Sequence, residues 1–452
     1  MAETRVFGNR PETILRKSPK KTASASNHVL MGTLLVVEDQ DGDWFKVETR
    51  GRGPGGWVFK DDIRDTPIFK AFYVDVGQGD GAIIESPEGV MMIDGGPTNA
   101  IYRFMLHRYK SIFKEGRKVH IKAMVISHPD ADHFKGCTAV LNDDRFTVGT
   151  LFHNGIIRYK KGQPDFNLGK TATRTIDGKP VEVLTETFND IEDIGELVDR
   201  DLADVSLIQF SFGKLMLAAW NAFADGRLDK AKRVTVRDKV LPGYSSTGEG
   251  KLHVKVLGPV PTKMSGRIEY VGFGKPALRG ETKDHKLDSS HTRNGHSIVL
   301  KLFFGKHIFL FGGDLNIPAE KHLIAHHGTS DHPFESDVAK ACHHGSSDFT
   351  TKWLKLVNPQ VNVFSSGDNK SFDHPVADAL GAAGQHSRGK IPLMFSTELA
   401  RATSRNGIHF GLINARSNGE ELVMAQMKEQ HRGKADVWDS FSVPWKGKFK
   451  DS

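Results

Sequence analysis

One short run, Ser127-His128-Pro129-Asp130-Ala131-Asp132-His133, constrains the fold more than any other segment. It brings two imidazoles and two carboxylates into six residues. The apolar segment 123–126 precedes it directly and predicts a buried β-strand. A strand that ends in such a loop directs several ligands at one place, because alternate residues of an extended chain point the same way. The run therefore predicts a divalent-metal site at a strand end.

Length and composition indicate a soluble protein of several domains. A chain of 452 residues predicts roughly two to three domains. No apolar run is long enough for a bilayer and no signal peptide is evident, so we expect a cytoplasmic protein without a membrane partner. The two cysteines, Cys137 and Cys342, give no disulfide framework and fit a reducing compartment. The net charge of +7 favours an anionic partner, although charge alone also fits a protein that binds no nucleic acid.

Residues 1–66 are expected to form a basic segment followed by a small β domain. Strands are predicted over 28–37, 44–49 and 57–59, with glycine-containing turns between them. The pattern with Met31-Gly32-Thr33, Trp44-Phe45 and Gly56-Trp57-Val58 resembles a bacterial SH3-like barrel. That resemblance implies an interaction module with a protein partner or an intramolecular contact. The alternative is a generic β extension of the main domain.

Residues 67–405 alternate strands with helical segments, a pattern that predicts α/β layering. Within them, residues at about 155–290 are polar and basic and are expected to form an insertion. One of its basic groups begins at Arg158, and another contains the substrate-binding candidates Lys230, Lys232 and Arg233. These groups are either a solvated surface or a rim that contacts phosphates. Residues 406–452 predict a β-hairpin and a basic tail, whose Trp438, Phe441 and Trp445 are expected to pack on the body of the protein.

Three further pieces carry candidate ligands or acid–base groups. Asp314 follows the apolar segment Phe309-Leu310-Phe311 and two glycines, which places a carboxylate at another strand end. The second piece is Cys342-His343-His344-Gly345, and the third is Asp373-His374-Pro375. Each piece alone is a weak signal, but all of them in one chain are hard to obtain by chance.

These pieces, with Tyr73-Val74-Asp75-Val76-Gly77-Gln78-Gly79-Asp80 and Ile93-Asp94-Gly95-Gly96, resemble the metallo-β-lactamase superfamily. Within it they are similar to the branch found as the soluble domain of ComEC-type DNA-uptake proteins. The resemblance covers about residues 68–380 without the insertion, and it implies an αββα sandwich with two divalent metal ions at one edge. The ComEC membrane channel has no counterpart here, so a role in DNA uptake does not carry over.

The resemblance also implies a role for each matching residue. One ion would be held by His128 and Asp130, and the other by Asp132 and His133. Asp314 would bridge the two ions. The second site would be completed by His343, with His344 either replacing it or facing the substrate. Asp94 would brace the ligand loop from behind.

The sequence departs from the wider superfamily at two places. Asp130 stands where most members have a histidine, and an oxygen-rich ligand set makes Mn²⁺ a competitor of Zn²⁺. The usual third histidine is not obvious, since Arg293 to Leu300 occupies its place, although Asn294 matches the branch. His296 is an extra candidate ligand, and the alternative is a histidine that fixes the start of a strand. The triplet at His326 is a weaker candidate.

The implied reaction is hydrolysis of a phosphodiester by a metal-activated hydroxide. Asp132 could orient the water as well as bind metal, while His344 or His374 could stabilise the developing anion or protonate the leaving oxygen. Asn294 and Ser346 are further substrate-binding candidates. We find no Ser-His-Asp set and no GxxxxGK[ST] phosphate loop, so a nucleotide-driven motor is not supported.

The leading expectation is therefore a nuclease acting on DNA. Within enzymes, the alternative is hydrolysis of a small phosphodiester, such as a nucleotide signal or a phosphorylcholine-type ester. A defence or toxin-like effector, held in check by a partner at the β domain, is compatible with the nuclease and concerns its context. A non-catalytic binding or scaffold protein is disfavoured, because every main ligand position is filled.

Overall fold

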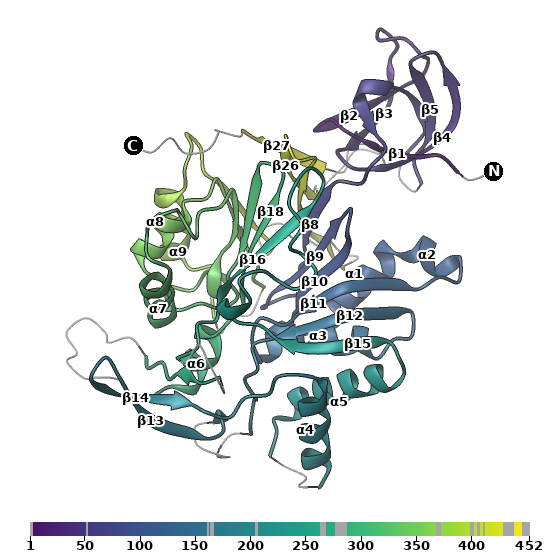
Figure 1. Cartoon of the computed structure of the whole chain (residues 1–452). Helices are drawn as coiled ribbons and strands as arrows, with labels where there is room; N and C mark the ends of the chain where they lie inside the picture. The colour runs from purple at the N-terminus through teal and green to yellow at the C-terminus, as the bar shows by residue number, and fades with distance from the viewer. Residues whose placement is uncertain are drawn as a thin grey trace.

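The computed structural model describes residues 3–50, 53–160, 162, 167–203, 207–262, 268–275, 287–367, 372–397, 402–404, 407–409, 412–427 and 438–444 (Figure 1). Within these residues the chain forms a mixed α/β structure with several sheets. An N-terminal β unit lies at one end of the molecule, beside a larger body of sheets and helices (Figure 1). Trp445 and most of the predicted basic tail lie outside the described residues.

The N-terminal unit is a seven-stranded sheet, which confirms the expected all-β segment. Alternating side chains bury a small aliphatic core that includes Val6, Leu15 and Val58. The β4–β5 hairpin turns at Gly42, whose φ of 56° suits glycine. The resemblance to an SH3-like barrel stays a prediction. In sheet order, the strands are β3 (Ala25–Leu30), β2 (Glu12–Arg16), β6 (Gly56–Phe59), β5 (Trp44–Glu48), β4 (Leu34–Asp41), β1 (Arg5–Gly8) and β7 (Ile63–Arg64).

This unit is docked onto the main body by buried contacts. The Arg416 guanidinium donates to the backbone oxygen of Met31 at 2.7 Å. Met31 also packs with Ile68 and Val423 in a cluster shielded from solvent. The intramolecular contact that the sequence left open as one role of the N-terminal unit is therefore present.

Two large sheets form the main body. The first has nine strands in the order β15 (Leu228–Arg233), β12 (Phe146–His153), β11 (Val119–Val125), β10 (Gly89–Gly95), β9 (Gly81–Ser86), β8 (Phe69–Tyr73), β25 (Ile413–Ser417), β26 (Leu422–Met427) and β27 (Trp438–Val443). The second has six strands in the order β16 (Leu252–Gly258), β18 (Val299–Phe304), β19 (His307–Phe311), β20 (Val338–Lys340), β21 (Val361–Phe364) and β22 (Leu393–Ser396). Strands β10, β11, β12 and β15 run parallel, as do β19 to β22.

The two sheets pack face to face around one apolar core. Phe69 of the first sheet stacks on Phe309 of the second, with ring centroids 4.3 Å apart. Tyr73 stacks on Phe311 in the same way at 5.7 Å. Aromatic side chains of this size bury large areas, so these contacts stabilise the pairing of the sheets.

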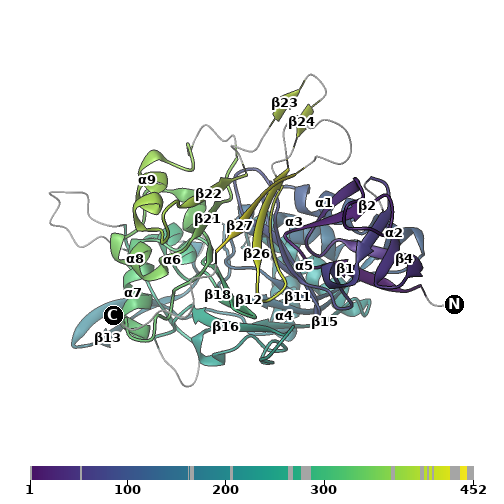
Figure 2. The ribbon, with the colours of Figure 1, turned by 90° about the horizontal axis from the view of Figure 1, so that it is seen from above.

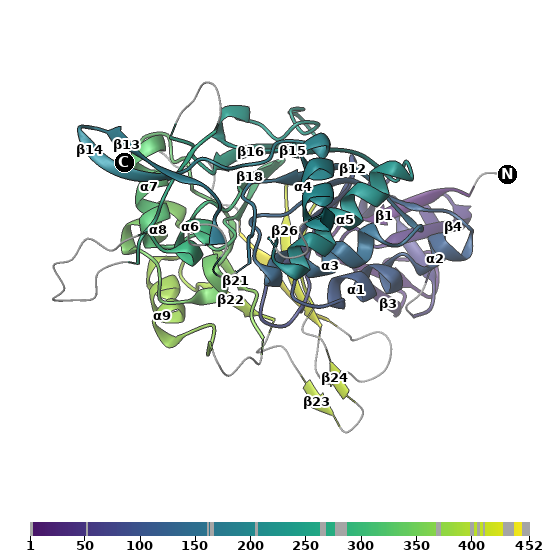
Figure 3. The same ribbon diagram turned by 90° about the horizontal axis from the view of Figure 1, so that it is seen from below.

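Helices cover the outer face of each sheet (Figures 2 and 3). The nine-stranded sheet carries α1 (Ala100–Arg108), α2 (Lys110–Lys114), α3 (Ala131–Leu141), α4 (Ile191–Ala203) and α5 (Phe210–Ala224). On the side of the six-stranded sheet lie α6 (Ser289–Gly295), α7 (Ile317–His327), α8 (Thr351–Val357) and α9 (Ala377–His386). The layers thus run helix, sheet, sheet, helix. Among the described residues, no helix is both long and apolar enough to cross a membrane.

The range 155–290 contributes to both large sheets as well as forming a projection. Strands β15 and β16 lie at the edges of the nine- and six-stranded sheets. A separate three-stranded sheet is built from β13 (Thr171–Ile176), β14 (Lys179–Leu184) and β17 (Tyr270–Val271). At the other end of the chain, β25 and β26 form an antiparallel hairpin beside β8. A small two-stranded sheet precedes that hairpin, and it consists of β23 (Ala402–Ser404) and β24 (Gly407–His409).

Candidate metal centre

Four buried side chains from four separate segments converge between the two sheets. They are Asp80 just before β9, His133 in the first turn of α3, Asp314 after β19, and His344 in the 3₁₀ turn Cys342–Gly345. One ligand atom of each lies within 4.8 Å of the others. The imidazole Nε2 atoms of His133 and His344 each lie 3.2 Å from Asp314 Oδ2.

The chemistry of this cluster fits a divalent metal ion. Nitrogen and carboxylate donors are the usual ligands of zinc and manganese. Among the described residues, several buried atoms here have no hydrogen-bond partner: His128 Nε2, His133 Nε2, His344 Nε2 and Asp314 Oδ1. A buried polar atom without a partner costs about 1–3 kcal/mol, and a bound ion would satisfy these atoms together. The cluster could therefore hold a metal ion.

A second layer of contacts orients each imidazole. Asp94 Oδ2 accepts a hydrogen bond from His133 Nδ1 at 2.9 Å, while Asp94 Oδ1 accepts from the Ser127 backbone N–H at 2.7 Å. His344 Nδ1 lies 3.1 Å from Asp80 Oδ1 and 3.0 Å from the Ser365 carbonyl oxygen. In both rings Nδ1 is occupied, so Nε2 is the nitrogen that faces the cluster. The contact predicted for Asp94 is present.

Charges in the cluster are strongly coupled. Burial alone would lower the pKa of His133 and His344, but the Asp314 carboxylate raises the pKa of both rings well above the ordinary value. Burial likewise opposes ionisation of Asp314, yet the neighbouring imidazoles hold its pKa well below the usual range. Lys340 contacts Asp80, and its Nζ lies 3.8 Å from Asp314 Oδ1. Because metal ligation needs a neutral imidazole, ion binding would release protons from the two rings.

The structure places His344, and not His343, inside the cluster. Both residues have left-handed backbone angles, with φ of 49° and 57°, so the chain turns sharply and separates their side chains. The Nε2 atom of His343 lies 4.0 Å from Asp314 Oδ2, and its side chain is 28% exposed. His343 thus borders the cluster, with Ser346 Oγ 3.3 Å from its Nδ1.

His128 and Asp132 border the same cluster. The rings of His128 and His133 have centroids 4.1 Å apart. Ser127 and Ser297 hydroxyls lie beside His128 Nδ1, at 3.1 and 3.3 Å. Asp132 Oδ2 lies 3.5 Å from His344 Nε2, and its side chain is 36% exposed. Asp132 therefore reaches both the buried ligands and solvent.

Asp130 is engaged elsewhere. Its Oδ1 accepts from Arg293 Nε at 2.7 Å and lies 3.0 Å from Arg158 Nη1. With the Asn294 amide turned so that its nitrogen faces this carboxylate, Asn294 donates to Asp130 Oδ2 at 3.3 Å. Burial opposes ionisation of Asp130, but the two arginines hold its pKa below the usual value. Asp130 is not among the four clustered ligands.

His374 lies at the border of the centre, held by a glutamine. Its ring centroid is 5.9 Å from that of His343 and 6.3 Å from that of His344. Gln78 Nε2 donates to His374 Nδ1 at 2.9 Å, and the Gly367 backbone N–H donates to Gln78 Oε1 at 3.4 Å. Since Nδ1 accepts, the proton of the neutral ring is on Nε2. Burial and the neighbouring histidines lower the pKa of His374 to about 4, so the ring is neutral near pH 7.

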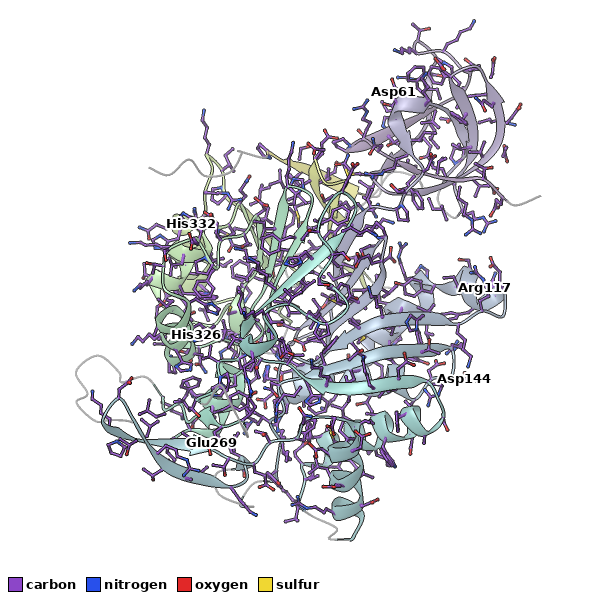
Figure 4. All side chains as sticks on the ribbon, viewed as in Figure 1. Asp61, Arg117, Asp144, Glu269, His326 and His332 are labelled. Atoms are coloured by element: carbon purple, nitrogen blue, oxygen red, sulfur yellow. The ribbon has the colours of Figure 1, made fainter. Side chains whose placement is uncertain are left out.

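The remaining candidates lie away from the cluster. His296 Nε2 is 2.7 Å from the Val271 carbonyl oxygen, and its ring stacks on Phe273. His326 lies on α7, in the outer helix layer (Figure 4). On β15, Lys230 is exposed and Lys232 Nζ pairs with Asp238 at 2.9 Å. Arg233 donates to the protein itself, at Thr187 Oγ1 and the Phe188 carbonyl oxygen.

Two residues of the centre had no assigned role in the sequence. Asp80 belongs to the Tyr73–Asp80 motif that suggested the family, but its side chain had no clear function there. Lys340 could not be found from the sequence, because a lysine at the end of the short strand β20 matches no functional motif.

No protein-family model matches the chain, and no curated protein matches it.

Proposed function

We propose that this chain is a metal-dependent phosphodiester hydrolase of the metallo-β-lactamase fold, and that it acts as a nuclease on DNA. The observation that carries the proposal is the buried set of unpartnered imidazole and carboxylate atoms at the ends of β11 and β19. The helix, sheet, sheet, helix order of the layers and the motif order in the sequence support it. We further propose two Zn²⁺ or Mn²⁺ ions as the cofactor, held by His133, Asp314 and His344 together with His128 and Asp132.

Divalent ions, when bound, polarise a phosphoryl oxygen and lower the pKa of a water molecule toward neutrality. Asp132 is suited to accept a hydrogen bond from the attacking water, because its carboxylate is both near the ligands and open to solvent. Asp94 and Asp80 keep the rings of His133 and His344 in one orientation during the reaction. These residues supply positions that need no reorganisation when substrate binds.

His374 is suited to act as a hydrogen-bond donor to the substrate. The amide of Gln78 occupies its Nδ1 and leaves Nε2–H free to donate toward a phosphoryl or leaving-group oxygen. The ring is half-buried at the border of the centre, where a donor is stronger than in water. Because water is the proposed nucleophile, the reaction needs no side-chain nucleophile, in agreement with the absence of a Ser-His-Asp set from the sequence.

The direct test incubates the purified protein with Mn²⁺ or Zn²⁺ and with linear, circular or single-stranded DNA. We expect cleavage that EDTA abolishes and that Asp314→Ala reduces to background with the circular dichroism spectrum unchanged. Cleavage by the Asp314→Ala variant at the wild-type rate would contradict the assigned centre. Hydrolysis of bis-p-nitrophenyl phosphate without cleavage of any DNA would show that the substrate is a small phosphodiester and not DNA.

A regulated effector is a proposal about context rather than chemistry. The N-terminal unit is already in contact with the main body through Arg416 and the Met31 cluster. A protein partner would therefore bind the outer surface of that unit. Co-purification of a partner with the full chain, lost when residues 1–66 are deleted, is the observation that would support this context.

A further inference from the structure

Two arginines share one carboxylate beside the metal centre. Asp130 Oδ1 accepts from Arg293 Nε and contacts Arg158 Nη1, at 2.7 and 3.0 Å. Arg158 comes from the segment after β12, and Arg293 comes from α6, so the pair joins both halves of the main body. Arg158 also donates to the Pro129 carbonyl oxygen at 3.2 Å.

Charged side chains gather at this point. The Asp130 carboxylate faces two guanidinium groups, and the Asp132 carboxylate also acts on Arg158. Burial and the like charge of Arg293 lower the pKa of Arg158, while Asp130 and Asp132 oppose this. Buried like charges are costly unless an anion compensates them. The Asp132 carboxylate also lies 3.5 Å from His344 Nε2, so its charge is shared between Arg158 and the cluster.

The two arginines differ in their access to solvent. The side chain of Arg293 is 7% exposed, whereas that of Arg158 is 23% exposed. Arg158 contacts Pro129 and Asp130 through Nη1, and Arg293 contacts Asp130 through Nε. Arg158 can therefore direct its other guanidinium N–H groups toward a ligand at the border of the centre. Arg293, in contrast, is held against Asp130.

We propose that Arg158 binds a phosphate group of the substrate beside the metal centre, and that Asp130 and Arg293 position it. The proposal rests on the proposed function, because it assumes a phosphodiester substrate, and it assigns Asp130 to the arginines instead of to a metal ion. A planar guanidinium offers paired donors that match two phosphate oxygens, and this is the reason for an arginine at such a site.

Binding of inorganic phosphate to the metal-loaded protein tests the proposal by isothermal titration calorimetry. We expect Arg158→Gln to weaken phosphate binding by about tenfold or more, because a charged hydrogen bond is lost. Lys160→Gln is the matched control, since it removes an exposed charge two residues away in the same segment. Its affinity should stay within about twofold of wild type. Equal affinities for wild type and Arg158→Gln, or no phosphate binding by wild type, would overturn the proposal.

The position of Asp130 is tested by metal content. Asp130→Asn should bind the same number of metal ions per chain as wild type, because the carboxylate serves the arginines, while phosphate affinity changes. Loss of one equivalent of metal in Asp130→Asn would show that Asp130 is a ligand and would overturn its positioning role. Phosphate binding that depends on Arg158 in a protein with no hydrolytic activity would contradict the proposed function and retain this subsite.

Discussion

Replacing Glu320 by glutamine should stabilise the protein, and increasingly so as pH rises. Glu320 lies on α7 and is fully buried. Its carboxylate accepts from the Thr350 backbone N–H, but Oε1 has no hydrogen-bond partner among the described residues. Burial, with a smaller contribution from nearby Asp348, raises the pKa of Glu320 from the ordinary 4.5 to about 8, against the opposing hydrogen bonds of Thr350 and the charge of Lys321.

The sign of the effect follows from the raised pKa. The folded chain holds the proton more tightly than the unfolded chain does, so the stability linked to this group is fully present below about pH 4.5. It is lost progressively as the pH rises through about 8, where the folded carboxyl also ionises. Each pKa unit of difference corresponds to about 1.36 kcal/mol, so the loss at high pH amounts to about 4–5 kcal/mol. Glutamine is neutral in both states and avoids this loss.

Urea unfolding at pH 5 and at pH 8.5, followed by tryptophan fluorescence, measures the effect. Between these two pH values, the stability advantage of Glu320→Gln over wild type should grow by about 4 kcal/mol. Glu196→Gln, at an exposed position on α4, is the control and should show no such growth. Titration of the metal centre is common to all three proteins and cancels from the differences. An advantage that is the same at both pH values would refute the reasoning.

Five further substitutions test the centre and the docking of the N-terminal unit. His344→Ala should abolish tight binding of Zn²⁺ in calorimetry while His343→Ala retains it, and the opposite pattern would reverse the ligand assignment. Asp94→Asn should lower metal affinity by about 10- to 100-fold, because His133 loses the group that orients it; unchanged affinity would remove Asp94 from that role. Gln78→Leu should lower kcat more than it raises KM, and a change in KM alone would argue against donation by the neighbouring ring. Arg416→Ala should speed proteolytic separation of residues 1–66, and cleavage at the wild-type rate would mean that the docking does not depend on this contact.

Much of the centre could be predicted from the sequence because its ligands follow apolar strands. Asp314 follows β19 closely, and the loop that leads from β11 into α3 contains His128 and is followed by His133 in the first turn of α3; strand ends of this kind appear in a sequence as apolar runs that stop at a turn. The α/β layering could also be predicted, because strands and helical segments alternate along residues 67–405.

What could not be predicted depends on backbone angles and on distant pairs. The choice between His343 and His344 is made by two consecutive left-handed residues, which nothing in the run Cys342-His343-His344-Gly345 specifies. Asp130 has partners 28 and 163 positions away in sequence, at Arg158 and Arg293, and local spacing gives no sign of either contact.

The polar, basic composition of the range 155–290 predicts an insertion, and the two strands that this range adds to the large sheets, β15 and β16, are edge strands. An edge strand keeps one side open to solvent, so it carries charges that hide its apolar positions. In β15 the residues Asp229, Lys230, Lys232 and Arg233 surround the two buried positions Leu228 and Ala231. Composition therefore predicts that this segment lies on the surface, although β15 is also the edge strand of the nine-stranded sheet. Arg233 is one example, because its guanidinium donates to Thr187 and Phe188 within the protein.

The position of β25 next to β8 has a consequence for biosynthesis. Strand β8 is the first strand of the main body to leave the ribosome, yet its neighbour in the sheet is translated some 340 residues later. Until then the edge of β8 stays open, and the Met31 surface that Val423 covers stays exposed. The metal ligands, by contrast, all precede residue 345 and are complete well before this edge closes. We therefore expect the nascent chain to pass through a stage in which the centre is assembled while the N-terminal unit is still undocked.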